Sequence, residues 1–188
     1  MTQDKAQVRA DLLARGRAMT TSARADAAEA IALHVLAVPV VSRARRVACY
    51  LSMPSEPGTA PLIAALIDHG IEVVVPLSLA DHSLEWVAHD PAALLVVNPL
   101  GIPEPDGPRL GAAALDTCGA VIVPALAVDH TGHRLGRGAG YYDRALAGVD
   151  RPVCALVFTH ELLPEVPHEP HDVPVQMAVT PDGLFRVP

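Results

Sequence analysis

Lysine is nearly absent from this sequence, since Lys5 is the single lysine among 188 residues and lies far from any glycine-rich turn. A Walker phosphate-binding loop needs a lysine followed by serine or threonine directly after its glycines. The shortage of lysine therefore excludes the P-loop kinases and GTPases.

Cysteine and long apolar runs are scarce as well. The three cysteines, Cys49, Cys118 and Cys154, are far apart, and each stands beside apolar residues. We expect buried free thiols in a reducing compartment rather than a disulfide or metal pattern. No apolar run approaches the ~18 to 20 residues of a membrane span, and the N-terminal segment lacks the apolar stretch of a signal peptide. The sequence therefore predicts a soluble cytoplasmic protein without a membrane partner.

Positive charge is also in short supply, because the formal net charge is −7 at pH 7. Proteins that bind nucleic acids usually have a basic surface. Here the arginines are scattered along the sequence, except for Arg43, Arg45 and Arg46, which we interpret as a solvated turn. We expect no nucleic-acid partner. The length and a hydrophobic content of 51% suffice for one sizeable core. We therefore expect a single domain over residues 1–188, and a monomer.

Helical and strand patterns alternate along the chain. Apolar and charged residues follow helical spacing at the N-terminus, and short β-rich runs that are apolar on both faces come later, as in buried parallel strands. The predicted helices span residues 2–19, 60–69 and a stretch from a cap at 20–22 to a stop before Pro39, and the predicted strands span residues 47–51, 71–75, 120–123 and 153–158. The pattern predicts an α/β fold in which helices flank a mostly parallel central sheet and an N-terminal helical pair precedes it.

Prolines and glycines crowd residues 99–108. Such a composition is typical of a loop, because proline cannot donate to a strand ladder and glycine weakens regular structure. We expect a surface loop without regular structure here.

Residues 134–143, Arg-Leu-Gly-Arg-Gly-Ala-Gly-Tyr-Tyr-Asp, carry two arginines, three glycines and the only adjacent aromatic pair. Glycines let the backbone approach an anion, guanidinium groups match phosphate oxygens, and a carboxylate can hold the magnesium that accompanies ATP. The spacing G-x-G-x-G differs from the Rossmann fingerprint, and a helix is expected over about residues 140–147. We interpret the segment as a nucleotide-binding loop; a tight turn packed by aromatics remains the alternative.

Residues 124–143 resemble the signature of the 5-formyltetrahydrofolate cyclo-ligase family, also called methenyltetrahydrofolate synthetases. Further matches fall in the family's order and approximate spacing: Lys5 and Arg9, residues 50–53 with Glu56 and Thr59, residues 101–105, residues 166–167, and His171 with Asp172. The chain departs from the family at Ala125, Val128 and Gln176, where glycine, phenylalanine and aspartate are usual. These departures concern local packing and a small part of the tail.

The resemblance implies a ligase that forms a C–N bond in one-carbon metabolism. It implies ATP- and Mg²⁺-dependent cyclisation of 5-formyltetrahydrofolate to 5,10-methenyltetrahydrofolate, with release of ADP and phosphate through a phosphorylated formyl intermediate. In phosphoryl transfer the protein mainly positions the reactants and neutralises their charge, so no nucleophilic side chain is required.

The resemblance also implies roles for individual residues. Catalytic roles fall to Arg134, Arg137 and Tyr141; ATP binding to Lys5, Arg9, Arg134, Gly136, Arg137, Gly138, Gly140 and Tyr142; folate binding to Leu51, Met53, Glu56, Trp86 and Tyr141; and Mg²⁺ binding to Asp143 and Asp172.

Without the resemblance, several of these residues have plainer interpretations. Lys5 and Arg9 are four residues apart and would form an ordinary solvated helix face. Leu51 and Met53 alternate as core residues of a strand do, and Glu56 could be an exposed turn carboxylate. Two other functions stay open: a non-catalytic nucleotide- or folate-binding module, and a different ATP-dependent ligase or phosphotransferase acting on another flat substrate.

Histidines raise the question of zinc. Residues 168–172 contain suitable residue types, but Pro170 breaks the helix that an H-E-x-x-H site requires and the spacing differs, so zinc is disfavoured. His130 and His133 flank a Thr-Gly turn, and we expect both to be exposed.

Overall fold

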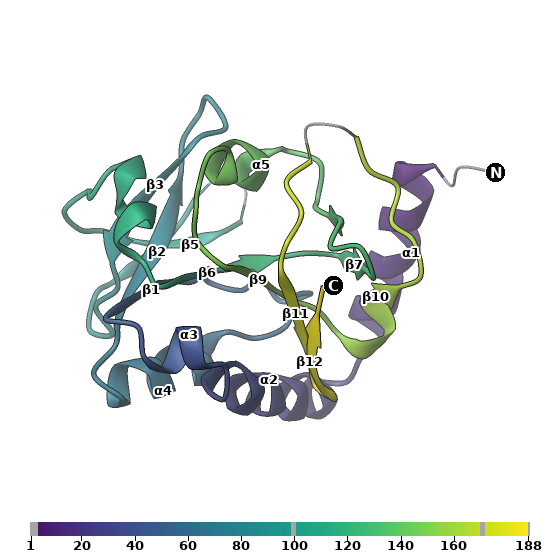
Figure 1. Cartoon of the computed structure of the whole chain (residues 1–188), viewed down its shortest axis with the longest axis horizontal. Helices are drawn as coiled ribbons and strands as arrows, with labels where there is room; N and C mark the ends of the chain where they lie inside the picture. The colour runs from purple at the N-terminus through teal and green to yellow at the C-terminus, as the bar shows by residue number, and fades with distance from the viewer. Residues whose placement is uncertain (1–3, 99–100, 170–171, 188) are drawn as a thin grey trace.

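The central feature of the fold is a seven-stranded sheet (Figure 1). The computed structural model describes residues 4–98, 101–169 and 172–187. In spatial order the strands are β12 (Gly183–Arg186), β11 (Met177–Thr180), β9 (Val153–Leu156), β6 (Ala120–Pro124), β1 (Arg46–Ala48), β2 (Glu72–Ser78) and β3 (Leu84–Ala88). The five inner strands pair in parallel, and the two edge strands are antiparallel to their neighbours.

Helices cover both faces of this sheet. The helices α2 (Thr21–Leu36), α3 (Pro39–Ser42) and α4 (Ala60–Asp68) lie on one face, and α5 (Tyr141–Leu146) lies on the other (Figure 1). The first layer packs Ile31 and Leu62 against the sheet, whereas the second packs Leu146 and Leu115, the latter from the 3₁₀ helix η1 (Ala112–Thr117). Strands β6, β9 and β11 are therefore buried on both faces, which explains their unbroken apolar sequences.

The first helix, α1 (Lys5–Ala18), packs on a separate small sheet rather than on the main one. This sheet has the order β10 (Leu162–Leu163), β7 (Ala127–Asp129) and β8 (Arg134–Leu135). Val8 and Leu12 of α1 form a third apolar cluster with Leu135 and Val166. This packing brings the polar face of α1 beside the residues that follow β8.

Most of the predicted elements are confirmed. The helical pair, α4, α5 and all four predicted strands are present, although β1 and β9 end earlier than expected, at Ala48 and Leu156. The three cysteines are buried and free, as predicted. In the part of the chain that the structure describes, no helix combines the length and apolarity needed to cross a membrane.

Two predictions were wrong in detail. Residues 99–108 are not wholly irregular, because β5 (Pro103–Pro105) pairs antiparallel with β4 (Leu95–Val97); Pro99 and Leu100 lie outside the described residues. A two-stranded sheet leaves edge positions where a missing N–H costs no ladder bond, so these prolines are tolerated. Arg46 is not part of a solvated turn: it begins β1, and its guanidinium contacts Glu72 at 2.8 Å.

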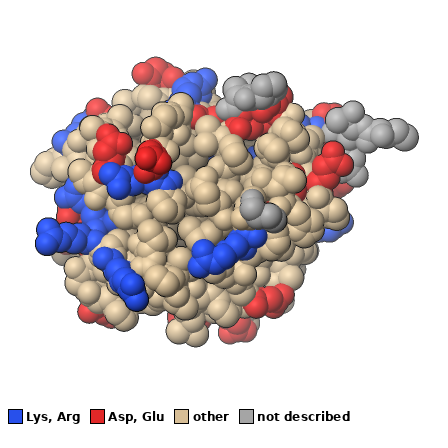
Figure 2. Space-filling model, in the orientation of Figure 1, with Lys and Arg blue, Asp and Glu red and all other residues tan. Residues whose placement is uncertain are grey.

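On the face drawn in Figure 2, some Lys and Arg side chains adjoin one another at the left of the view, and acidic side chains lie at several places among the basic ones. The expectation that the protein has no nucleic-acid partner stays a prediction.

Candidate active site

A cavity of about 630 Å³ opens at the carboxyl ends of β1, β2 and β6, the edge at which parallel sheets usually bind ligands. Pockets that hold small molecules commonly measure about 300–1,000 Å³. Fourteen of the residues predicted for the site line this cavity: Lys5, Arg9, Leu51, Met53, Glu56, Arg134, Gly136, Arg137, Gly138, Gly140, Tyr141, Tyr142, Asp143 and Asp172. Sequence positions that are more than 160 residues apart thus meet in one site, since Lys5 contacts Asp172.

The glycine-rich loop is hydrogen-bonded to α1 at the wall of the cavity. Arg9 Nε donates a hydrogen bond to the carbonyl of Gly136 at 2.9 Å. Gly138 has φ +101°, and a Cβ there would lie 3.5 Å from the guanidinium carbon of Arg9. Gly140, with φ +73°, adopts the left-handed conformation directly before α5. Glycine suits both positions because other residues would be strained there.

Arg134 is the most buried cation of the site. Its side chain is 3% exposed, and Nη2 donates to Asp143 Oδ1 at 2.5 Å. Burial lowers the pKa of Arg134, and the negative charges of Asp143 and Asp172 partly offset that effect. The Nε atom has no hydrogen-bond partner among the described residues. A buried donor without a partner is a natural contact for an anionic ligand.

Lys5 forms the second cationic group, at the start of α1. Its Nζ donates to Glu169 Oε1 at 3.0 Å and to Asp172 Oδ2 at 3.1 Å. Burial lowers the pKa of Lys5, but the two carboxylate hydrogen bonds together outweigh it and the pKa is raised. Lys5 therefore remains protonated, and it is not the ordinary solvated side chain that the sequence alone allowed.

Glu56 also lines the cavity, where it is 8% exposed and not an open turn carboxylate. Its Oε2 accepts the backbone N–H of Met53 at 2.9 Å, and its Oε1 accepts Arg137 Nε at 3.0 Å. Arg137 also donates to Ser55 Oγ at 2.8 Å. Arg137 thus links the glycine-rich loop to the Glu56 turn, a pairing that no local sequence pattern indicates. Leu51 and Met53 are half-buried at the cavity wall rather than in the core.

The two adjacent tyrosines lie differently. Tyr141 donates its hydroxyl to the carbonyl of Leu79 at 3.3 Å, and its ring centroid lies 5.2 Å from that of His82. The hydroxyl of Tyr142 is buried and has no partner among the described residues. Burial raises its pKa well above the ordinary value, so Tyr142 acts at neutral pH as a neutral hydroxyl.

Comparison with known proteins agrees with this geometry. The sequence profile of the 5-formyltetrahydrofolate cyclo-ligase family matches residues 1–181. The chain is 37% identical to a 5-formyltetrahydrofolate cyclo-ligase of Mycolicibacterium smegmatis, covering 95% of this chain and 94% of that protein. It is 32% identical to the Escherichia coli cyclo-ligase, with coverages of 92% and 97%. The NMR structure of Aquifex aeolicus 5,10-methenyltetrahydrofolate synthetase superposes with a TM-score of 0.82 at 26% identity, covering 97% of this chain and 92% of that one.

The chain belongs to the 5-formyltetrahydrofolate cyclo-ligase family. It is therefore an enzyme, and the α/β fold is that of the methenyltetrahydrofolate synthetases.

Trp86 is the one predicted site residue that does not line the cavity of this cyclo-ligase family member. It is 1% exposed and lies opposite Pro76 in the β2–β3 ladder, packed with Leu115 in the core. The register of an edge strand decides which face an aromatic residue takes, and here it points inward. The structure therefore corrects the prediction that Trp86 contacts a ligand.

Sequence reasoning also missed residues of the cavity. Ile102 and Pro103, next to and within β5, contribute to its wall, and so does Glu169 beside Lys5. The signal for Ile102 and Pro103 was that they lie within residues 101–105, which resemble the family, and the signal for Glu169 was its closeness to Asp172.

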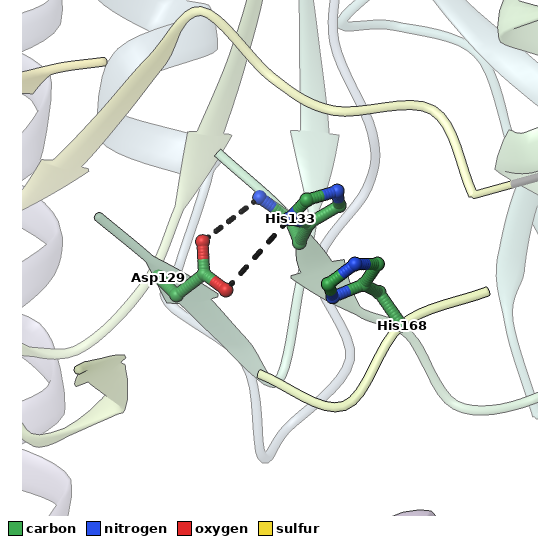
Figure 3. Close-up of side chains that lie close together, drawn as sticks. All are labelled: Asp129, His133 and His168. Carbon is green, nitrogen blue, oxygen red and sulfur yellow. Dashed lines mark hydrogen bonds and ion pairs between the residues drawn. The ribbon is translucent and has the colours of Figure 1, made fainter. Parts of the chain in front are cut away.

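His133 contradicts the expectation of exposure, whereas His130 meets it. The ring of His133 stacks on that of His168, with centroids 3.5 Å apart and planes inclined by 5° (Figure 3). Both rings lie near Asp129, outside the residues that line the cavity.

Proposed function

We propose that the protein catalyses the ATP- and Mg²⁺-dependent cyclisation of 5-formyltetrahydrofolate to 5,10-methenyltetrahydrofolate, with release of ADP and phosphate. The observation that carries this proposal is a single cavity lined by two unlike groups of residues. One group contains the cations Arg9, Arg134 and Lys5; the other contains half-buried apolar side chains and the buried carboxylate of Glu56. Arg137 of the glycine-rich loop contacts Glu56 and so joins the two groups.

The cationic group of residues suits the phosphates of ATP. In the proposed first step the formyl oxygen attacks the γ-phosphorus, and the bond to ADP breaks. Transfer of this kind gains most from fixed positive charge around the transferred group. Burial holds Arg134 in place and two carboxylates hold Lys5 in place, so both cations are already positioned to donate to phosphate oxygens.

The carboxylates of Asp143 and Asp172 fit a magnesium ion. They supply only oxygen donors, and both lie near Arg134. Each is paired with a cation, Asp172 with Lys5 and Asp143 with Arg134, and a phosphate group could replace the carboxylate as the partner of that cation. When bound with ATP, the ion would neutralise charge on the phosphate oxygens. Asp143 and Asp172 would hold it together with phosphate oxygens and water.

The group of residues around Glu56 suits the folate ring system. A buried carboxylate can accept hydrogen bonds from pterin nitrogens, and Leu51 and Met53 supply an apolar wall. Tyr141, which also lines the cavity, can stack on a flat ring. This arrangement would hold the formyl group next to the phosphates.

In the second proposed step N10 of the folate attacks the activated formyl carbon. The new C–N bond forms, the C–O bond to phosphate breaks, and N10 loses its proton. The protein needs no nucleophile of its own for either step, and its contribution is to orient both substrates and exclude water.

The test incubates purified protein with ATP, Mg²⁺ and 5-formyltetrahydrofolate and follows the near-ultraviolet band of the methenyl product. We expect product only with all three present, and ADP in equal amount. ATP binding by a folded protein without any product would leave a binding module or a different ligase as the function. A monomeric, cytoplasmic enzyme with no further partner completes the proposal, and sedimentation analysis tests its oligomeric state.

A further inference from the structure

The turn between β7 and β8, residues 129–133, lies outside the cavity but contacts the tail segment that enters it. Asp129 is 2% exposed, and its Oδ1 accepts the backbone N–H groups of Thr131 at 2.8 Å and His133 at 3.1 Å. These bonds fix the shape of the turn. The other oxygen, Oδ2, accepts the backbone N–H of Val166 at 3.0 Å. One carboxylate therefore joins the turn to the start of the tail segment.

The stacked histidines form a second contact between turn and tail (Figure 3). The hydroxyl of Thr131 donates to Asp129, so it accepts the Nδ1–H of His133, 2.8 Å away. The Nδ1 of His168 lies 3.1 Å from the carbonyl of Val166, which can only accept. Each ring is thus held in one orientation, with its face against the other.

A third contact fastens the far end of the segment. The backbone N–H of Val175 donates to the carbonyl of Gly132 at 2.8 Å. Gly132 has φ +87°, and a Cβ there would come within 2.4 Å of the carbonyl oxygen of Val175. Only glycine allows this close approach. The turn therefore holds residue 166 and residue 175, and Asp172, which contacts Lys5, lies between them.

We propose that the turn 129–133 is a positioning element of the active site. Through Asp129, Gly132 and the His133–His168 stack it fixes where Asp172 lies relative to Arg134, the residue that directly follows the turn. The kinetic part of this inference rests on the proposed function. It assigns His133 and His168 a role in Mg²⁺ and ATP use although neither lines the cavity.

Asp129, His133 and His168 also have the composition of a transition-metal site, with ligand atoms within 4.8 Å of one another among the described residues. Their hydrogen bonds favour positioning instead. Asp129 already accepts four bonds, and both Nδ1 atoms are engaged. Nitrogen lone pairs lie in the ring planes, so two nearly parallel rings do not direct them to one point.

The experiment compares His168→Ala with His168→Phe, which keeps a ring, and with His130→Ala as a matched control. His130 lies in the same turn but is exposed, and its ring contacts Phe185 instead. We expect His168→Ala to raise the KM for Mg²⁺ and ATP about two- to tenfold, the range expected for the loss of one ring pair. His168→Phe should restore most of the loss. The KM for 5-formyltetrahydrofolate should stay unchanged in all three variants.

Hydrogen exchange gives a readout that needs no activity. His168→Ala should speed amide exchange at Val166 and Val175, and His130→Ala should not. If His168→Ala shows the faster exchange but the wild-type protein has no cyclo-ligase activity, the proposed function is refuted and the positioning role is supported. Two results would overturn the positioning role: kinetics and exchange in His168→Ala that match His130→Ala, or stoichiometric Zn²⁺ binding by the wild type that His168→Ala abolishes.

Discussion

Replacing Asp143 by asparagine removes one of the two carboxylates proposed for Mg²⁺ while keeping the size of the side chain. Asparagine can still accept the hydrogen bond from Arg134, which is 3% exposed in its side chain. The guanidinium would, however, lose the nearest charge that compensates its burial. The variant therefore separates the loss of a metal ligand from the loss of a contact.

The structure allows the cost to be estimated. A hydrogen bond to a charged group contributes about 1.5–3 kcal/mol, and the retained amide contact and nearby Asp172 leave the loss at about 1–2 kcal/mol. In a domain of this size each kcal/mol lowers the Tm by about 2–4 °C, so we expect Asp143→Asn to melt about 2–8 °C lower. The fold should remain intact at 25 °C, where activity is measured.

Kinetics then decide the role of Asp143. We expect Asp143→Asn to raise the apparent KM for Mg²⁺ at least about tenfold and to lower kcat, because one oxygen ligand has lost its charge. The KM for 5-formyltetrahydrofolate should change little, since Asp143 pairs with Arg134 whereas Glu56 pairs with Arg137. Unchanged Mg²⁺ dependence in a folded variant would refute the assignment of Asp143.

Three further predictions concern stability and ligand preference. Burial raises the pKa of Glu161 from 4.5 to about 8. The stability that protonated Glu161 contributes is therefore fully present below the pKa of the unfolded state and is lost as pH rises toward 8. Over this pH range the unfolding free energy of Glu161→Gln, measured by urea melts, should depend less on pH than that of the wild type. Glu56→Gln should raise the KM for 5-formyltetrahydrofolate about tenfold or more with little effect on that for ATP, and equal effects on both substrates would contradict a divided site. Trp86→Phe should lower the Tm but leave both KM values unchanged, because Trp86 lies in the core. A selective rise in the folate KM would instead show that Trp86 supports folate binding.

The sheet could be predicted because its inner strands are buried on both faces and therefore have continuous apolar sequences, as in β6 and β9. The short antiparallel pair β4–β5 could not. Its prolines are acceptable only at an edge, and an edge is a property of the tertiary pairing rather than of the local sequence. For the same reason, the side to which Trp86 points depended on a strand register that composition does not reveal.

In the candidate site, too, contacts within one segment could be predicted, whereas contacts between distant segments could not. Arg134 and Asp143 lie close in sequence, so their joint role could be inferred from one segment. The contact between Arg137 and Glu56 joins residues 81 positions apart, and no local pattern indicates it. The stack of His133 on His168 likewise depends on the return of the tail to the β7–β8 turn, which the sequence does not record.

In the proposed reaction, a phosphoryl group passes from ATP to the formyl oxygen of 5-formyltetrahydrofolate, and the ring then closes in the same cavity. A decisive experiment uses substrate whose formyl oxygen is a heavy isotope and analyses the released phosphate by mass spectrometry while the methenyl band is followed. We expect methenyl product, an equal amount of ADP, and the heavy oxygen in the phosphate. Heavy oxygen in water instead, or ATP hydrolysis without methenyl product, would contradict it.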